Sequence, residues 1–311
     1  MRGSRLWLTR RRFRYFWLSL SCLAFFAVAW IPLTTLPVVA QPTLWECPSP
    51  ATQSEQSEPT PLRVSTPVAE FPVEGGDLTV FAAASLTDAF EAIESDLESA
   101  NPDLSITYNF GGSPALVTQL KEGAEADVFA SANVAQMDAA LEAGLITGDA
   151  TTFVRNRLVI VTPADNPAVI ESAADLGEEG TLLVLAQAAV PVGQYAREAV
   201  CLMAIDAATY GSDFVQRVAA NVVSEEEDVR DVLAKVALGE ADAGIVYVSD
   251  AAAAGEQVHV VDIPDEVNVI ATYPIAVLAE GDQALGSAFI AYLLRDEGHV
   301  LLERFGFQPV A

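Results

Sequence analysis

The chain is poor in the residue types on which most enzymes and metalloproteins depend. Its 311 residues include two histidines, His259 and His299, and three cysteines, Cys22, Cys47 and Cys201. No Cys-x-x-Cys or His-Glu-x-x-His spacing occurs and the carboxylates are scattered, so we expect neither a cofactor nor a site for a free metal cation. The Gly-x-Ser-x-Gly signature of serine hydrolases is also missing. These absences predict that the protein is not an enzyme.

Basic residues are also scarce. The chain has 16 Lys and Arg against 43 Asp and Glu, which gives a formal net charge of −27. So acidic a chain is a poor partner for nucleic acid or for anionic lipid, and we expect neither. A site for a small anion would have to use short-range hydrogen bonds and local dipoles, because the long-range field repels such a ligand. The acids themselves are interpreted as a solvated, solubilising surface.

Residues 1–40 have the composition of an export signal. Six arginines precede the apolar run Tyr15–Trp30, and Val38–Ala40 offers small residues for cleavage before Gln41. The stretch Thr9–Phe13 resembles a twin-arginine signal; ordinary secretory export and an uncleaved membrane anchor remain the alternatives. We therefore expect a periplasmic or otherwise extracytoplasmic protein.

Residues 41–76 differ in composition from the rest of the chain. They are rich in Pro, Ser, Thr, Gln and Glu and have few regular apolar positions, which predicts a flexible leader. Cys47 lies in this leader and Cys201 in the folded part. An exported protein could join the two, but their spacing alone is a weak indication of a disulfide bond.

The folded part is organised around a strand, a tight turn and a helix. Leu78–Phe81 has the apolar character of a buried strand, and Ala89–Leu97 repeats apolar residues at helical spacing. Ser85 falls at the junction, where the free amides and the positive dipole end of the helix favour a small anion. The alternative is that Ser85 simply caps the helix, since serine is a preferred N-cap residue.

The same arrangement recurs at Ser113. Ile106–Phe110 is predicted as a strand, Gly111-Gly112 as a turn, Ser113 as a helix cap and Pro114 as the first helical residue. Strand and helix patterns then alternate to the C-terminus, which favours an α/β fold with largely parallel sheets. In such sheets these junctions share the carboxyl edge, so we expect both serine hydroxyls to lie in one crevice.

Six motifs together resemble the molybdate-binding proteins of ABC importers. They run from about Leu78 to Phe307, and their order makes the resemblance specific although each is weak alone: Val80–Leu86, Gly111–Ser113, Ala126–Ser131, Val190–Ala196, Glu227–Arg230 and Gly244–Tyr247. The resemblance implies an α/β fold of the two-lobed periplasmic binding protein type (type II), with a mainly parallel sheet flanked by helices in each lobe. Residues 77–160 and 249–311 would form lobe I, and residues 161–248 lobe II.

The resemblance also implies which residues hold the anion. Ser85 and Ser113 would donate their hydroxyls from lobe I. Val192 and Val229 would donate backbone amides from lobe II, although the family often has alanine where this chain has Val192, whose larger side chain crowds the site. Tyr247 would donate its hydroxyl from the end of the strand that returns to the hinge, and without the family match it could equally be a core residue.

Such a donor set carries no charge, and this restricts the ligand. A fully deprotonated tetrahedral dianion accepts hydrogen bonds at every oxygen, whereas hydrogen phosphate also needs an acceptor for its own proton. Sulfate passes this test and must be excluded by size. The resemblance implies molybdate or tungstate as the ligand, carried by a monomer to an ABC importer that consists of a membrane permease and a cytoplasmic ATPase. A binding protein for another oxoanion such as sulfate, and a membrane-anchored oxoanion sensor, remain the alternatives.

Overall fold

The computed structural model describes residues 45, 47 and 75–310. The predicted export signal, residues 1–40, and most of the predicted leader, residues 41–76, lie outside these residues. Across the residues that are described, no helix is both long enough and apolar enough to cross a membrane. A disulfide bond joins Cys47 of the leader to Cys201, so the pairing that the sequence indicated only weakly is present.

A single sheet path runs through the folded part in the order β2-β1-β3-β9-β4-β7-β5-β6, and β8 and β10 also pair with β4. The strands are β1 (Gly76–Ala83), β2 (Leu104–Gly111), β3 (Val128–Ala130), β4 (Thr151–Pro163), β5 (Leu183–Ala186), β6 (Val222–Glu226), β7 (Ala243–Tyr247), β8 (Val258–Asp262), β9 (Ile270–Val277) and β10 (Gln308–Pro309).

The first lobe is built around β1. This strand lies between β2 and β3 and is parallel to both, and β9 adds an antiparallel neighbour to β3. Helices cover the strands, so β1 is buried from Val80 to Ala83 and reads as a continuous apolar run. The helices of this lobe are α1 (Thr87–Ala100), α2 (Ser113–Lys121), α3 (Val134–Glu142), α8 (Gln283–Leu293) and α9 (Asp296–Arg304).

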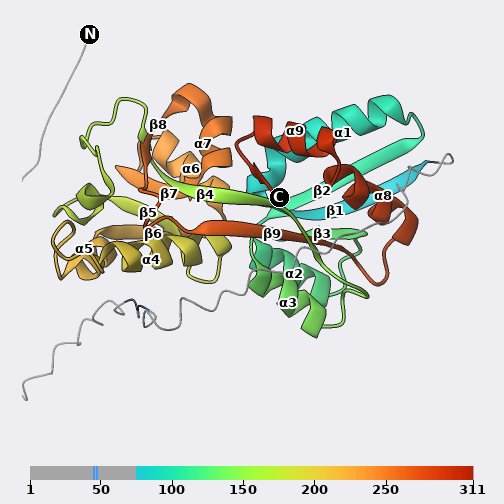
Figure 1. The fold of residues 1–311 in the computed structure, drawn as a ribbon, viewed down its shortest axis with the longest axis horizontal. Coiled ribbons are helices and arrows are strands. Elements are labelled where there is room, and N and C mark those ends of the chain that lie inside the picture. The colour runs from blue at the N-terminus through green and yellow to red at the C-terminus, as the bar shows by residue number, and fades with distance from the viewer. Residues whose placement is uncertain (1–44, 46, 48–74, 311) are drawn as a thin grey trace, which may run out of the picture. The chain divides into compact units, whose positions relative to one another are not determined.

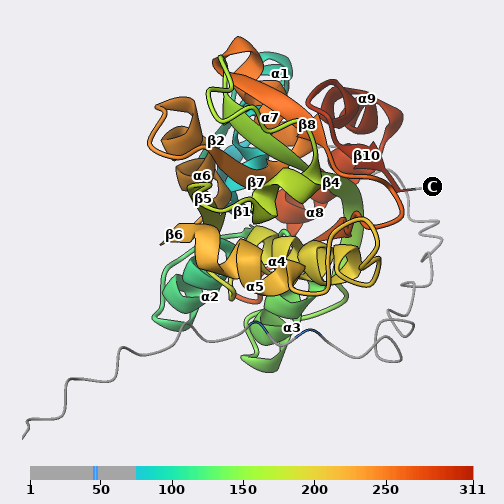
Figure 2. The same ribbon diagram turned by 90° about the vertical axis from the view of Figure 1, so that its left-hand side faces the viewer.

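The second lobe repeats this plan around β5, which lies between β6 and β7 and is parallel to both. Figure 2 shows α4 and α5 on one side of these strands, with α6 and α7 on the other. The helices of the second lobe are α4 (Pro191–Met203), α5 (Phe214–Asn221), α6 (Val229–Ala237) and α7 (Val248–Ala254).

Two strands connect the lobes, as Figure 1 shows for β4 and β9. The first half of β4, Thr151–Arg157, pairs with β9, and the second half, from Leu158, pairs with β7 and β8. The predicted α/β fold with two lobes is thus confirmed. The sheet around β1 and that around β5 are parallel, whereas the pairs that β4 and β9 make are antiparallel. The sequence placed residues 249–311, which include β8, in lobe I. Because β8 pairs with the same half of β4 as β7, we propose that the chain returns to the first lobe at β9.

Candidate functional site

A small cavity, called here the interlobe cavity, lies where the two lobes meet. Its volume of about 10 Å³ is about that of one water-sized group. All five residues of the predicted site belong to its lining, which consists of Ala83, Ala84, Ser85, Gly111, Gly112, Ser113, Ala132, Val190, Pro191, Val192, Asp228, Val229 and Tyr247. The structure therefore brings the five together, and their binding roles remain predictions.

Ser85 lies in a short 3-10 turn, Ala84–Leu86, between β1 and α1. The N-cap of α1 is Leu86, and no side chain caps this helix, so the alternative that Ser85 is only a cap is wrong. The Ser85 side chain is buried, and its Oγ lies 2.8 Å from the hydroxyl oxygen of Tyr273 on β9. Ser85 therefore does not act as a helix cap, and it belongs to the lining of the interlobe cavity.

Ser113 is the first residue of α2 rather than its cap, which is Gly112. The prediction was wrong by one position, because the extended backbone of Gly112 already performs the capping turn. The buried Ser113 Oγ accepts a hydrogen bond of 3.1 Å from the backbone N–H of Ala132. With its oxygen engaged in this way, the hydroxyl proton of Ser113 is left for the interlobe cavity.

Two helices of the second lobe begin at the cavity. Val192 is the second residue of α4, after Val190 as N-cap and Pro191, so its N–H has no acceptor within the helix. Val229 is the first residue of α6. The Asp228 carboxylate caps α6 by accepting from the N–H groups of Arg230 and Asp231, at 2.8 and 3.0 Å, and this leaves the Val229 N–H unused.

Tyr247 ends β7 and is fully buried. Its hydroxyl has no hydrogen-bond partner among the residues that the structure describes, which is unusual for a buried polar group. Burial raises the pKa of Tyr247 well above its ordinary value, so the hydroxyl keeps its proton. A protonated, unpartnered hydroxyl in the lining of a cavity is a ready donor for an anion.

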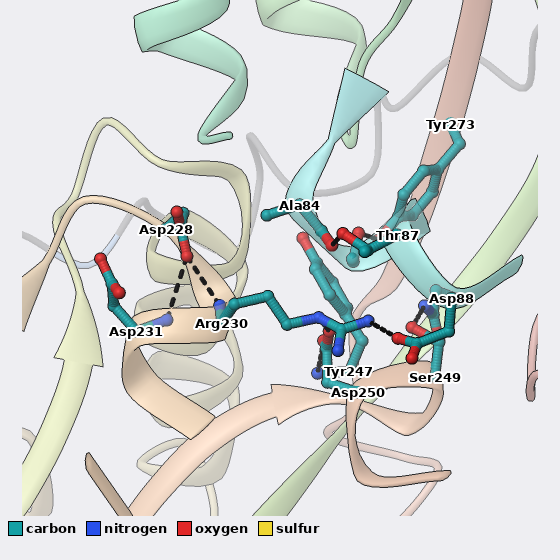
Figure 3. Close-up of polar contacts among 12 residues, drawn as sticks. Ala84, Thr87, Asp88, Asp228, Arg230, Asp231, Tyr247, Ser249, Asp250 and Tyr273 are labelled. Atoms are coloured by element: carbon teal, nitrogen blue, oxygen red, sulfur yellow. Dashed lines mark hydrogen bonds and ion pairs between the residues drawn. The ribbon is translucent and has the colours of Figure 1, made fainter. Parts of the chain in front are cut away.

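No Lys or Arg belongs to the lining of the cavity. The cation beside it is Arg230, whose guanidinium is taken up by two carboxylates: it forms an ion pair with Asp88 of α1, and its Nε lies 3.0 Å from Asp250 of α7 (Figure 3). Among the described residues there is also no group of three or more His, Cys, Asp or Glu that could hold a metal ion. The site can therefore hold an anion through neutral donors and helix dipoles.

Contacts between the lobes show that the structure is closed around the cavity. Besides the Arg230–Asp88 pair, the Asn133 amide of the first lobe donates to the Gln194 side chain of α4 at 3.2 Å. Gly112 also packs so closely on the second lobe that an added Cβ would lie 2.3 Å from the carbonyl oxygen of Glu227. A ligand in the cavity would be enclosed by both lobes.

Sequence reasoning did not identify two residues at this site. Tyr273 belongs to none of the six motifs. The apolar residues around it predict only a buried strand, so the local sequence does not indicate a role at the site. Arg230 lies inside the motif Glu227–Arg230, but its partner Asp88 is 142 positions away, and only the fold shows that they meet.

Comparisons with known proteins place the chain in a family. It matches the model for bacterial extracellular solute-binding protein over residues 78–308. The molybdate-binding protein ModA of Mycobacterium tuberculosis (strain ATCC 25618 / H37Rv) is 43% identical over 238 residues, which is 76% of this chain and 86% of ModA.

Solved structures agree in fold. The substrate binding domain of a putative molybdenum ABC transporter from Clostridium difficile covers 76% of this chain and 99% of its own, with a TM-score of 0.56 and 29% identity. The periplasmic molybdate-binding protein of Azotobacter vinelandii covers 75% and 100%, with a TM-score of 0.65; at 16% identity it bears on the fold alone. The chain therefore belongs to the bacterial extracellular solute-binding proteins, among the relatives of ModA.

Proposed function

We propose that this protein captures molybdate in the interlobe cavity and delivers it to an ABC importer. The observation that carries the proposal is the donor set in one small cavity: two serine hydroxyls, one tyrosine hydroxyl and the N–H groups of Val192 and Val229. Each donor is neutral, and a tetrahedral dianion can accept a hydrogen bond from each without a counter-charge. The similarity to ModA supports the choice of molybdate.

The acidic surface is compatible with this ligand. The field of a chain with net charge −27 acts over long distances and is screened by salt, whereas the five donors act at hydrogen-bond distance inside a closed cavity. Each donor is expected to contribute about 1–3 kcal/mol to binding. Tungstate has nearly the same size and charge, so we include it as a ligand. Sulfate is smaller and also fully deprotonated, so the cavity must reject it by size.

Calorimetric titration of the purified protein with molybdate, tungstate, sulfate and phosphate tests this function. We expect tight binding of molybdate and tungstate at one site, weak binding of sulfate and no measurable binding of phosphate. The Ser85→Ala/Ser113→Ala double variant, titrated in parallel, should lose most of the affinity. Comparable binding of phosphate by the parent protein would contradict the neutral-donor site, and a preference for sulfate would move the function to another oxoanion.

Delivery to an importer rests on the family and on the predicted export signal. We infer that the protein works outside the cytoplasm as a monomer, together with a membrane permease and a cytoplasmic ATPase. Molybdate uptake in a strain that lacks this protein and other uptake routes tests the inference. Uptake should fall and should return when the parent gene is restored, but not with the double serine variant; unchanged uptake in the deletion strain would remove the transport role while leaving binding untouched.

A further inference from the structure

Arg197 lies on α4, one turn after Gly193, and does not belong to the lining of the interlobe cavity. Its side chain is largely buried, and the ring of Trp45 from the leader covers the guanidinium, with the ring centroid 5.0 Å from Cζ. A buried guanidinium needs acceptors from the protein, because it cannot lose its charge.

The guanidinium of Arg197 joins three segments of the second lobe. Its Nη1 donates to the Ala186 carbonyl at the end of β5, at 2.8 Å, and to the Gly193 carbonyl in the first turn of α4, at 2.7 Å. Its Nη2 forms an ion pair with the Glu225 carboxylate on β6. The planar fork of an arginine holds such acceptors in one fixed geometry. Arg197 therefore fixes the start of α4 relative to the ends of two neighbouring strands.

The first turn of α4 packs directly on the end of β5. An added Cβ on Gly193 would lie 2.4 Å from the carbonyl oxygen of Ala186 and 2.2 Å from that of Gln187, so only a glycine allows so close an approach. Val192, whose N–H is one of the predicted donors, directly precedes this glycine. The place of the Val192 N–H in the cavity therefore depends on how α4 is held against β5.

The contact with Glu225 leads to the other amide donor of the second lobe. β6 ends at Glu226, the residue after Glu225, and α6 begins shortly afterwards at Val229. Glu226 accepts from the Lys235 ammonium of α6 at 2.6 Å, so α6 is tied to the end of β6. Since β5 and β6 are parallel neighbours, the starts of α4 and α6 lie at the same edge of the sheet. Arg197 thus connects the two segments that carry the amide donors of this lobe.

We propose that Arg197 is a positioning residue that sets the distance between the Val192 and Val229 N–H groups, and through it the size of the anion that the cavity accepts. The inference rests on the proposed function, in which sulfate has to be rejected by size. Without the guanidinium, the two helix starts are free to move closer together and to close on a smaller dianion. The discrimination between molybdate and sulfate then falls, even where molybdate still binds.

Titration of the Arg197→Gln variant with molybdate and with sulfate tests the proposal. Both ligands are dianions, so the lost charge changes both affinities alike and cancels in their ratio. We expect the ratio of molybdate affinity to sulfate affinity to fall by about fivefold or more, the equivalent of one hydrogen bond.

Arg217 provides the matched control, because it makes the same kinds of contact elsewhere in the second lobe. Its guanidinium donates to the carbonyls of Gly177 and Tyr210 at 2.7 and 2.6 Å, pairs with Asp213 and lies over the ring of Phe214. None of these residues belongs to the cavity lining. Arg217→Gln should therefore keep the ratio within about twofold of the parent value. An equal fall for Arg217→Gln would overturn the proposal, because the effect would then be a general loss of packing.

A second variant decides the matter if Arg197→Gln does not fold. The Glu225 side chain is half exposed, so Glu225→Ala should fold, and it removes the link to β6 while Arg197 keeps both carbonyl acceptors. The affinity ratio should fall in the same direction, whereas Asp213→Ala, which removes the carboxylate partner of Arg217, should leave it unchanged.

The outcomes separate this inference from the proposed function. If the parent protein binds no molybdate, the proposed function fails and the inference fails with it. If the parent binds molybdate and sulfate equally well, there is no size selection for Arg197 to set, and the inference is wrong although the cavity binds oxoanions. If the parent selects molybdate and the folded variant keeps the parent ratio, the positioning role is wrong while the proposed function stands.

Discussion

Arg230 on α6 forms an ion pair with Asp88 on α1, and this pair crosses from the second lobe to the first beside the interlobe cavity (Figure 3). Both residues are close in the sequence to predicted site residues: Arg230 follows Val229, and Asp88 comes about one helical turn after Ser85. Because the pair joins the two lobes, we expect it to break when the lobes separate. Whether this ion pair forms therefore depends on whether the two lobes are closed, although neither residue belongs to the cavity lining.

Asp88→Asn is expected to weaken molybdate binding by about two- to fivefold, the range for a partly exposed ion pair, and mainly by faster release. Above about pH 7, where Asp250 is ionised, Arg230→Gln should have a larger effect on folding, since it leaves this fully buried carboxylate without its cation. Loss of one partner of a buried pair costs about 3–5 kcal/mol. Titrations and stopped-flow release, with urea unfolding of each variant, measure both effects.

The Arg217–Asp213 pair provides the control for these variants. It joins residues four apart within the second lobe and is exposed, so Asp213→Asn should change neither the affinity nor the release rate. If Asp213→Asn weakens binding as much as Asp88→Asn, the effect is a general one of charge, and the interlobe pair does not hold the closed state.

Gly112→Ala should prevent full closure. The added Cβ would lie 2.3 Å from the carbonyl oxygen of Glu227, a backbone atom that cannot move aside without moving the second lobe. We expect an affinity at least tenfold weaker and, with saturating molybdate, a radius of gyration larger than that of the parent in small-angle scattering. Gly111→Ala is the control for closure alone: Gly111 also lines the cavity, but its Cβ would meet the Leu116 side chain at an ordinary 3.6 Å and not the second lobe, so this variant should keep the radius of gyration of the parent. A compact, tightly binding Gly112→Ala variant would contradict the closed contact described here.

Truncating single donors should have unequal effects. Ser113→Ala removes a donor to the anion and also leaves the buried Ala132 N–H without its acceptor, so we expect a loss of about ten- to hundredfold in affinity. Tyr247→Phe leaves no protein group unpaired, because its hydroxyl has no partner among the described residues, and should cost less, about fivefold. Calorimetry measures both, with the exposed Ser172→Ala as control. A larger loss of affinity for Tyr247→Phe than for Ser113→Ala would contradict the argument that the unpaired Ala132 N–H adds to the cost of losing the Ser113 hydroxyl.

Local sequence predicted part of the site. Ser85 and Ser113 were expected at helix starts from neighbouring turn residues, whereas the roles of Val192, Val229 and Tyr247 came from the resemblance to molybdate-binding proteins, and the structure brings all five into one cavity lining. The α/β class followed from the alternation of strand and helix patterns, which also depends on residues that are neighbours in the chain.

The remainder depends on partners far apart in the chain. Ser85 and Tyr273 are 188 positions apart, and Asn156 and Ser249 are 93 apart, so no local pattern announces their contacts. The course of β4 depends on such contacts as well. The strand begins at Thr151 and runs through Asn156, a polar residue that can be buried in mid-strand only because distant groups satisfy its amide.

Loss of the disulfide bond should lower stability and leave the site intact. Cys201 lies on α4, which also carries Val192, and the bond closes a loop of 154 residues. Cys47→Ser is expected to reduce the free energy of unfolding by about 2–5 kcal/mol, because the unfolded chain gains conformational freedom. Thermal unfolding and calorimetry with reductant, for parent and variant, measure the effect. Molybdate affinity should stay within about twofold; a much weaker affinity would mean that the leader takes part in shaping the site.

Asp250 should make stability depend on pH in the direction opposite to that of an ordinary ion-paired carboxylate. Burial raises the pKa of Asp250 from 3.8 to about 7, and Arg230 only partly opposes this rise. Between these two values the folded protein holds a proton that the unfolded chain releases. The contribution of Asp250 to stability is therefore fully present below about pH 4 and is lost as the pH rises toward about 7.

Urea unfolding of the parent and of Asp250→Asn at several pH values isolates this contribution, because the other carboxylates are common to both proteins. Asparagine carries no charge and can still accept the hydrogen bond that the Tyr247 N–H gives to Asp250 at 3.1 Å. The free energy of unfolding of the variant, relative to the parent, should therefore rise as the pH increases from about 4 to about 7. Asp213→Asn, at an exposed carboxylate, should show no such rise. A constant difference between parent and Asp250→Asn across this range would mean that Asp250 stays ionised in its pair with Arg230.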